Sequence, residues 1–427
     1  MKRNSTLNGL ILLLAILTGL SSCTDNCEKT RVYRTTVAFQ IGREQLKAGI
    51  QNAAPQEIEN PGKIYAIGNF LLINEVKKGL HIIDNTNPSS PQNVAFFKIP
   101  GVIDMAVKGN ILYTDNYTDL VAFDISDVKN IKEVGRKNNM FVNGMVDGIS
   151  WYYDPYSKII TDYAWKTVTE KVKTGCGEGS TVWPGGGVYY DTGFFNGSNG
   201  TNGSAAGTNG QGGSMARFTI YQDYLYAATQ SDLLVFDIKN QQKPDSISKV
   251  NLGWGIETIF PYQDKLFIGS NTGMHIFDNS NPAKPVRTSI FQHVRACDPV
   301  VVEGNKAYVT MRTGICGVAP NRMDVVDVSN LSSPQLIRSY EMENPHGLAI
   351  NNANLMVCEG QFGLKSFNAA NASDITLNQH IKNIDAFDVI PVSNTLLIMI
   401  GKDGLYQYDY SDPKNLKLLS HIKVKSI

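Results

Sequence analysis

A short run of apolar residues, closed by Asp in six copies and by Asn in one, recurs along the chain. The copies are Leu80–Asp84 (LHIID), Leu120–Asp124 (LVAFD), Leu233–Asp237 (LLVFD), Met274–Asp278 (MHIFD), Met323–Asp327 (MDVVD), Leu364–Asn368 (LKSFN) and Leu405–Asp409 (LYQYD). Successive copies are separated by 40, 113, 41, 49, 41 and 41 residues. The long step of 113 residues therefore contains an insertion, and the step of 49 contains a small one. A fixed period of this length is typical of proteins built from one repeated unit.

Each copy predicts four strands, as residues 103–136 illustrate. Stretches suited to strands occur at Asp104–Val107, Ile111–Thr114, Leu120–Asp124 and Ile131–Val134, separated by polar turns. The turn after the third stretch is rich in Asn, Ser and Pro, which favour tight connections between strands. The third stretches are apolar on both sides, which requires a sheet covered on both faces. Helical solenoids are excluded because the apolar runs lack a spacing of 3.6 residues.

Four strands in each repeat of about 40 residues are typical of propeller blades. The sequence therefore predicts an all-β protein, a seven-bladed β-propeller of four-stranded antiparallel blades over residues 61–427. Six or eight blades are the alternatives, since the insertion before Leu233 blurs one boundary between blades. Residues 23–60 are expected to form an N-terminal tether, which includes a candidate strand for closing the propeller.

The insertion runs from about residue 138 to 214 and has two halves. The first is rich in Trp and Tyr and is expected to form a hairpin that either contacts a partner or covers apolar blade surface. The second is a Gly/Asn/Ser-rich tract from Asn196 to Ser214. Such a tract has too few apolar groups to offset the entropy of ordering, so a flexible loop without a function of its own is expected.

The N-terminus resembles the signal peptide of a bacterial lipoprotein. Lys2 and Arg3 precede an apolar run from Leu10 to Leu20, too short to span a bilayer comfortably, and Leu20-Ser21-Ser22-Cys23 resembles a lipobox. The resemblance implies a signal peptide over residues 1–22 and lipidation of Cys23, which anchors the protein to a membrane without crossing it. An ordinary signal peptide cut elsewhere and an uncleaved anchor are the alternatives. Lipoproteins that stay in an inner membrane commonly have Asp directly after the lipidated cysteine. This chain has Thr24 there, which favours the outer membrane, either on its periplasmic side or at the cell surface.

The composition limits the classes of partner that the chain is expected to bind. The chain has 39 basic and 39 acidic residues, and the absence of a basic excess argues against nucleic acid. Export permits disulfides among the six cysteines, none of which has a metal-ligand spacing. A disulfide between Cys297 and Cys316 is expected because both precede or join strands at one face of the same blade, with Cys358 on the next blade as the competing partner. No cofactor or metal site is indicated.

The seven pentapeptides in phase resemble the LVIVD-repeat family of propeller-like proteins. The resemblance covers roughly residues 61–427 and includes the phrases Glu257–Pro261 (ETIFP) and Cys297–Val300 (CDPV). It implies a propeller that is often exported, and it implies no general biochemical activity.

Polar residues near the starts of the expected first strands are the candidate ligand-binding residues. In a propeller these positions would ring one mouth of the central channel; they are Asp104, Arg217, Glu257, Asp298, His346 and Asp385. Loops between second and third strands would add Glu75, Asp115, Asn116, Arg312 and Glu359 around them. Converging carboxylates with an Arg and a His suit a polar ligand, although channel mouths are also polar because they are wet.

No catalytic signature such as HExxH, GxSxG or a phosphate-binding loop is present. The first hypothesis is therefore a cell-envelope lipoprotein that binds a ligand, such as a protein or glycan partner, through the ringed face. The second is an extracellular hydrolase or lyase that acts on a polymer with two ring carboxylates and His346 as general base. The third is a structural assembly protein.

Overall fold

The structure, a computed structural model, describes residues 26–146, 148–175, 211–214, 216–293, 299–313 and 320–425. Every structural statement below concerns these residues. They are almost entirely strands and tight turns, and their single α-helix is α2 (Arg43–Ala48). None of the described helical segments has the length and hydropathy needed to cross a bilayer.

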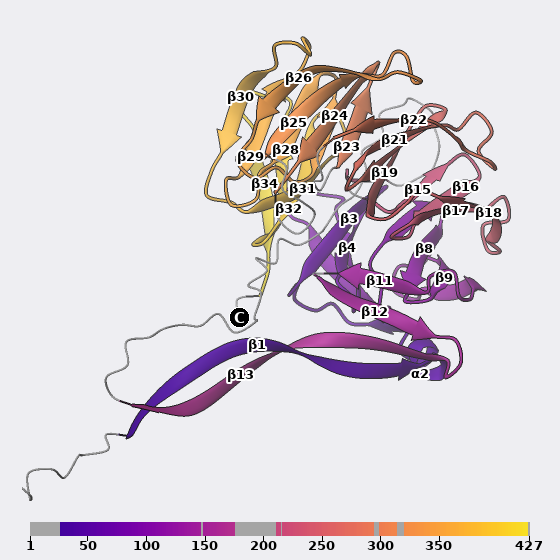
Figure 1. Cartoon of the computed structure of the whole chain (residues 1–427), viewed down its shortest axis with the longest axis vertical. Helices are drawn as coiled ribbons and strands as arrows, with labels where there is room; N and C mark the ends of the chain where they lie inside the picture. Colours follow the sequence, from indigo (N-terminus) through magenta and orange to yellow (C-terminus); the bar gives the residue numbers. More distant parts are fainter. Residues whose placement is uncertain are drawn as a thin grey trace, which may run out of the picture. The chain divides into compact units, whose positions relative to one another are not determined.

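Seven sheets, here called repeat sheets one to seven, share the same order of four antiparallel strands (Figure 1). Sheet one holds β3 (Pro61–Ile67), β4 (Phe70–Glu75), β5 (Gly79–Asp84) and β6 (Gln92–Lys98). Sheet two holds β7 (Met105–Lys108), β8 (Ile111–Asn116), β9 (Asp119–Asp124) and β10 (Lys132–Lys137). Sheet three holds β15 (Phe218–Tyr221), β16 (Tyr224–Ala228), β17 (Asp232–Asp237) and β18 (Asp245–Asn251). Sheet four holds β19 (Ile256–Tyr262), β20 (Lys265–Ser270), β21 (Gly273–Asp278) and β22 (Val286–Gln292).

The remaining three repeat sheets continue the series. Sheet five holds β23 (Val300–Glu303), β24 (Lys306–Met311), β25 (Arg322–Asp327) and β26 (Gln335–Glu341). Sheet six holds β27 (Leu348–Asn351), β28 (Asn354–Cys358), β29 (Leu364–Asn368) and β30 (Thr376–Ile381). Sheet seven holds β31 (Ala386–Pro391), β32 (Leu396–Gly401), β33 (Gly404–Asp409) and β34 (Lys417–Lys423). In sheet one, β14 (Gln211–Gly212) adds beside β3 and β2 (Gln51–Ala53) adds beside β6.

An eighth sheet lies outside the repeat series. Its strands are β1 (Asn26–Gly42), β13 (Ile159–Gly175), β12 (Ile149–Asp154) and β11 (Asn143–Val146), in that order. Three of them belong to the insertion, where β12 and β13 form the hairpin that the aromatic half of the sequence suggested. The chain divides into two compact units, and β1 and β13 both pass from one to the other. One unit includes Asn26–Phe39 and Tyr163–Gly175, here called the ribbon, and the other includes all the repeat sheets.

The seven pentapeptides are the third strands of the seven repeat sheets, as the sequence predicts. In six of the seven strands the apolar residues are buried on both sides, which explains why the pattern does not alternate, whereas Phe367 of β29 is half-buried. The residue that closes each copy accepts a hydrogen bond from the backbone N–H two positions later, at 2.8 to 3.0 Å. The repeated Asp therefore builds the turn into the fourth strand, and Asn368 does the same in the sixth sheet.

Contacts between sheets follow the order of the chain. The first strand of each repeat sheet contacts the first strand of the next, from β3 and β7 through to β27 and β31. The last sheet also contacts the first, because β3 contacts β32. Apolar residues of both sheets, among them Ile64 and Ile398, share one buried cluster. A parallel bridge from Ile58 to Val424 adds a further link between the two ends of the repeat region.

The end of the insertion differs from expectation. The sequence assigns residues up to Ser214 to a flexible loop, whereas Gln211 and Gly212 form β14 and pair with Ala66 and Tyr65 of β3. Gly212, Gly213 and Ser214 are buried. The tract from Asn196 to Gly210 lies outside the described residues, so the loop stays a prediction there. The bounds of residues 1–22, 23–60 and 61–427 as separate regions also stay predictions.

Candidate functional site

The described ring candidates all lie at the starts of first strands. Asp104, Arg217 and Asp385 immediately precede β7, β15 and β31. Glu257 is the second residue of β19, and His346 stands two residues before β27. Asp298, Cys297 and Cys316 lie outside the described residues, as does Cys23, so the predicted disulfide and lipidation stay predictions.

Two of these residues come together in a buried polar cluster between repeat sheets one, two and three. The Lys63 ammonium group donates a hydrogen bond to the Asp104 carboxylate, and the backbone N–H of Arg217 donates to the same oxygen. Asp115 accepts the backbone N–H groups of Ile103 and Asp104 at 2.8 and 2.9 Å. Burial lowers the pKa of Lys63, and the opposite charge of Asp104 counters part of that effect.

Burial changes the pKa of Asp115 in this cluster. Burial raises the pKa of Asp115 to about 7, against the lowering effect of its two backbone donors and of Lys63. The repulsion from Asp104 adds to the increase. Asp115 therefore titrates near neutral pH, although both acidic residues have partners that hold them in place.

Little room remains beside the cluster. A cavity of about 40 Å³ is lined by Asp104, Asp115 and Arg217 and walled by aromatic residues that include Trp151. The indole Nε1 of Trp151 is buried and has no hydrogen-bond partner among the described residues. A space of this size accommodates water but not an organic ligand. The polar cluster thus provides charge pairing between sheets and no pocket for a polymer.

The described end of the insertion is hydrogen-bonded to first strands of several repeat sheets. Ser214 Oγ accepts the N–H of Leu348, which starts β27, at 2.9 Å and donates to Asp388 of β31 at 3.3 Å. The carbonyl of Ala216 accepts the N–H of Ile259 of β19 at 2.8 Å. Together with β14 on β3, these bonds join residues 211–214 and Ala216 to first strands in sheets one, four, six and seven. This role could not be predicted from composition, because a Gly/Ser tract ordinarily indicates a linker.

His346 is held inside the protein. Its side chain is 3% exposed and lies against the ring of Phe387, with 5.6 Å between the ring centroids. Burial, and secondarily the charge of Arg312, lowers the pKa of His346 well below its ordinary value. Cys358 beside it is a free buried thiol whose pKa burial raises well above its ordinary value. A neutral, enclosed imidazole does not suit a general base acting on an extracellular polymer.

Other residues expected around the ring are bound into internal pairs. Glu75 is 3.0 Å from His81 Nε2 and accepts the backbone N–H groups of Glu59 and Asn60. Burial alone would raise the pKa of Glu75, but these donors lower it. Glu359 pairs with Lys365 at 3.0 Å. In the described part of the chain, no three His, Cys, Asp or Glu side chains converge as a metal site would require.

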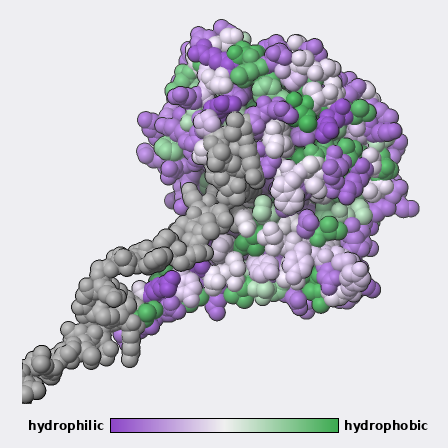
Figure 2. All heavy atoms as spheres, viewed as in Figure 1, coloured by the Kyte–Doolittle hydropathy of each residue, from purple (hydrophilic) through white to green (hydrophobic). Residues whose placement is uncertain are grey.

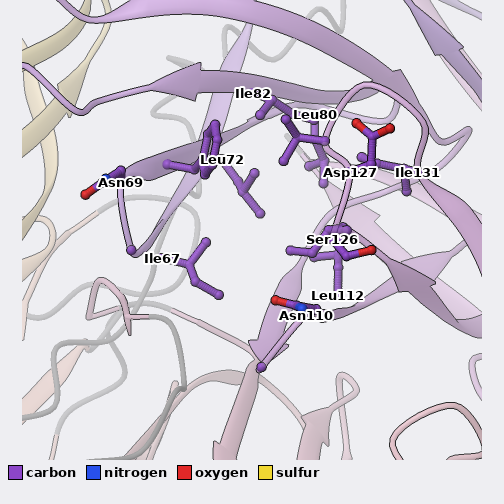
Figure 3. Close-up of a pocket in the computed structure, with 15 residues that line it drawn as sticks. Ile67, Asn69, Leu72, Leu80, Ile82, Asn110, Leu112, Ser126, Asp127 and Ile131 are labelled. Atoms are coloured by element: carbon purple, nitrogen blue, oxygen red, sulfur yellow. The ribbon is translucent and has the colours of Figure 1, made fainter.

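A further cavity lies elsewhere, between repeat sheets one and two (Figure 3). Its volume is about 910 Å³, within the range of ligand sites in proteins. It lies beside the β3–β4 and β7–β8 turns and the segment after β9, away from the starts of the first strands. None of its residues is among those that the sequence predicts to bind a ligand.

Apolar side chains from both sheets form the walls of this cavity. Figure 3 shows the side chains of the two sheets converging on it, and the apolar lining residues are Ile67, Phe70, Leu72, Leu80, Ile82, Leu112, Ile125, Val128 and Ile131. Polar groups come from turns and connections: Asn69, Asn110, Ser126 and Asp127. An apolar interior with a few amide, hydroxyl and carboxylate groups suits a ligand with an apolar body and one hydrogen-bonding end.

Sequence comparison identifies the repeat itself. A family model described as the LVIVD repeat matches residues 62–97, 212–251 and 295–342. These segments correspond to the first, third and fifth repeat sheets. The chain thus contains LVIVD repeats in three segments. No curated protein matches the chain.

Solved structures resemble the chain at low identity. A protein of unknown function from Desulfotomaculum acetoxidans has a TM-score of 0.51 and 11% identity, covering 83% of this chain and 95% of the other. BamB from Moraxella catarrhalis has a TM-score of 0.45 and 8% identity, covering 84% and 98%. PorZ, a surface component of the type-IX secretion system of Porphyromonas gingivalis, has a TM-score of 0.46 and 11% identity, covering 88% and 39%. Of these three, the first alone exceeds 0.5, and it bears on the fold alone.

Proposed function

We propose that this protein is a binding module of the bacterial cell envelope that takes a small, largely apolar ligand into the cavity between repeat sheets one and two. The cavity of about 910 Å³ is the observation that carries this proposal. A closed propeller of seven blades is the scaffold, with the seven repeat sheets as its blades. The lipid anchor at Cys23 holds the module at the outer membrane, on its periplasmic side or at the cell surface.

The chemistry of the cavity favours this class of ligand. Leu72, Leu80, Ile82 and Leu112 are each 2% exposed or less, so an apolar molecule seated among them would contact side chains already shielded from water. Moving apolar surface from water into such a site contributes about 25 cal/mol for each Å². The polar end of the ligand would meet the groups contributed by the turns, where Asn69, Asn110 and Ser126 offer both donors and acceptors.

The alternative site, at the predicted ring of polar residues, has weaker support. Its charged groups already have partners within the protein, and the space beside Asp104 is about 40 Å³. Removing a charge there would therefore disturb packing between sheets before it changed the recognition of a ligand. We therefore propose the cavity between the first two sheets, and not the ringed face, as the binding site.

A fluorescence titration tests the cavity. The probe is N-phenyl-1-naphthylamine, an apolar dye whose emission increases in a dry site. We expect saturable binding to the wild-type protein and a loss of at least about tenfold in affinity for Ser126→Trp, because the indole ring occupies the cavity. Equal binding by wild type and Ser126→Trp would contradict the proposal.

The same serine position in another repeat sheet provides a matched control. Ser329 follows Asp327 as Ser126 follows Asp124, and both serines donate their backbone N–H to that aspartate at 2.8 to 2.9 Å. Ser329 does not line the cavity between sheets one and two. Ser329→Trp should therefore bind the dye as the wild type does. A loss of binding in both variants would indicate a general effect of the substitution on the turn.

The lipid anchor has a separate test. Mass spectrometry of the N-terminal peptide from protein expressed in a Gram-negative host should show Cys23 as the first residue, carrying a diacylglyceryl group. The Cys23→Ser variant should lose that modification. An unmodified N-terminus at another residue would contradict the anchor and leave the cavity proposal standing.

A further inference from the structure

The ribbon, Asn26–Phe39 of β1 and Tyr163–Gly175 of β13, is a pair of long strands with little burial (Figure 1). Six large apolar side chains on it are 37% to 59% exposed: Val32, Tyr33, Val37, Phe39, Trp165 and Val172. A two-stranded ribbon without a core is only marginally stable in water. Figure 2 shows hydrophobic and hydrophilic residues interspersed over the visible surface. The ribbon thus has both the exposed apolar surface and the need for a supporting one.

The ribbon is also basic, although the whole chain is neutral. Its basic residues are Lys29, Arg31, Arg34, Lys166, Lys171 and Lys173, against the acidic Glu28 and Glu170. Six positive and two negative charges give a net charge of +4 in this part of a chain with 39 residues of each sign. A surface of this sign attracts the anionic headgroups of a membrane.

Arginine and aromatic side chains are paired on the ribbon. The guanidinium of Arg31 lies 5.3 Å from the centre of the Tyr33 ring, and that of Arg34 lies 4.9 Å from the centre of the Trp165 ring. Tyr and Trp are enriched where a membrane meets water, because one part of the ring system is apolar and another forms hydrogen bonds. Basic groups beside them supply the charge that binds phosphate.

The ribbon begins close to the expected anchor. Asn26, the first residue of β1, is three residues after Cys23. A chain spans at most about 3.6 Å for each residue, so the two Cα atoms lie within about 11 Å of each other. Lipidation at Cys23 would therefore bring the start of β1 to the headgroup region of the same membrane. This step rests on the lipid anchor of the proposed function.

We infer that the ribbon binds the surface of an anionic lipid bilayer, with its basic side chains on the phosphates and its aromatic side chains among the headgroups. The recognised chemistry is the anionic phospholipid surface and no particular lipid. Addition of a strand from another polypeptide is less favoured, because Lys and Arg along both strands oppose edge-to-edge pairing. Contact with the membrane gives the exposed apolar residues of the ribbon the cover that the ribbon itself cannot provide.

A vesicle assay tests this inference without the acyl chains. The protein from position 23 onward carries Cys23→Ser and is sedimented with vesicles of phosphatidylcholine alone or of phosphatidylcholine with one third phosphatidylglycerol. We expect binding to the anionic vesicles, little binding to the neutral ones, and loss of binding at high salt. Binding that ignores lipid charge and salt, or no binding at all, would overturn the inference.

Charge reversal on the ribbon has a matched control on the repeat sheets. Arg31→Glu with Arg34→Glu should weaken binding to anionic vesicles by about tenfold or more, since each change removes an attraction and adds a repulsion. Lys414→Glu with Lys417→Glu changes the net charge equally at two exposed positions in sheet seven, and should leave binding within about twofold. Equal losses in the two double variants would overturn the ribbon as the binding surface.

Two further readings separate the remaining alternatives. Trp165→Ser keeps every charge and should weaken binding a few-fold while the salt dependence persists; an unchanged affinity would overturn the role of the aromatic side chains.

Sedimentation velocity over a range of concentrations should show a monomer, both for the wild type and for the Arg31 and Arg34 double variant. A dimer dissociated by the Arg31 and Arg34 changes would overturn the inference in favour of a second copy of the chain. Failure of either test leaves the dye titration of the cavity unaffected.

Discussion

The side-chain amides of Asn85 and Gln407 bind each other in both directions. Asn85 Nδ2 donates to Gln407 Oε1 at 2.9 Å, and Gln407 Nε2 donates to Asn85 Oδ1 at 2.7 Å. The two residues are 322 positions apart and are 8% and 0% exposed. The reciprocal pair therefore joins the first repeat sheet to the last, beside the apolar cluster that the two sheets share.

The amide pair should contribute measurably to stability. Asn85→Ala or Gln407→Ala leaves a buried amide without its partner, which costs about 1–3 kcal/mol of the free energy of unfolding. The double variant should cost less than the sum of the two, because neither amide is then left unpaired. Urea denaturation measures all three, with Gln335→Ala at an exposed position as a control expected within about 0.5 kcal/mol of wild type. Strictly additive losses would contradict the interaction between the two sheets.

The recurring turn aspartates should make stability depend on pH in acid. Hydrogen bonds from the Ser329 side chain and backbone N–H, with Lys306, hold the pKa of Asp327 at about 2. Because this folded-state pKa lies below the unfolded one, its stabilisation is present above about pH 4 and is lost as pH falls toward 2. Asp327→Asn keeps the acceptor for the Ser329 N–H and should flatten that part of the melting temperature against pH.

Asn368 provides the comparison for the turn aspartates. It accepts the same backbone bond, from Ala370 at 3.0 Å, with a group that does not titrate. Asn368→Ala should therefore reduce the free energy of unfolding by about 1 kcal/mol, the cost of a lost cap. The melting temperature should fall equally at neutral and acid pH. A loss that appears only in acid would show that the bond is not the cause.

The buried Asp115 should have the opposite effect on how stability depends on pH. Its folded-state pKa of about 7 exceeds the unfolded value, so protonation favours the folded protein and ionisation destabilises it as pH rises from about 4 to 7. Asp115→Asn keeps an acceptor for the N–H groups of Ile103 and Asp104. The variant should gain stability relative to wild type as pH rises through this window, by at most about 1.4 kcal/mol for each pH unit. A constant difference across the window would show an ordinary pKa.

Residues 211–214 should contribute to the stability of the protein despite their Gly/Ser composition, because they are hydrogen-bonded to first strands. Ser214→Ala removes the acceptor of the buried Leu348 N–H and one donor to Asp388. We expect a loss of about 1–3 kcal/mol in the free energy of unfolding. Ser157→Ala, at an exposed turn where the hydroxyl donates to Asp154 at 2.6 Å, should change stability by less than about 0.5 kcal/mol. Equal, small effects would mean that residues 211–214 are not docked.

The repeats could be predicted from sequence because the signal is written seven times. Six of the seven third strands are buried on both faces, so their apolar runs persist, and each closing Asp or Asn has a turn to stabilise. The starts of first strands could be placed to within two residues, as His346 before β27 shows. What those positions do could not be predicted, since the partners of Asp104 come from Lys63 in another sheet and from the backbone of Arg217.

Two features escaped the sequence for physical reasons. Ser214 lies in a tract whose composition indicates a linker, and only the surrounding first strands make its burial favourable. The cavity between sheets one and two is lined by residues such as Leu72 and Leu112 that occupy ordinary core positions of their strands. A gap between two sheets is a property of how they pack, and no single residue type indicates it.

A crystal structure of the protein grown with N-phenyl-1-naphthylamine tests the binding site most directly. The account predicts density for the dye between Leu72 of the first repeat sheet and Leu112 of the second, with its amine near the side chains of the adjoining turns. Density for the dye elsewhere, with these two side chains in direct contact across a closed gap, would contradict it.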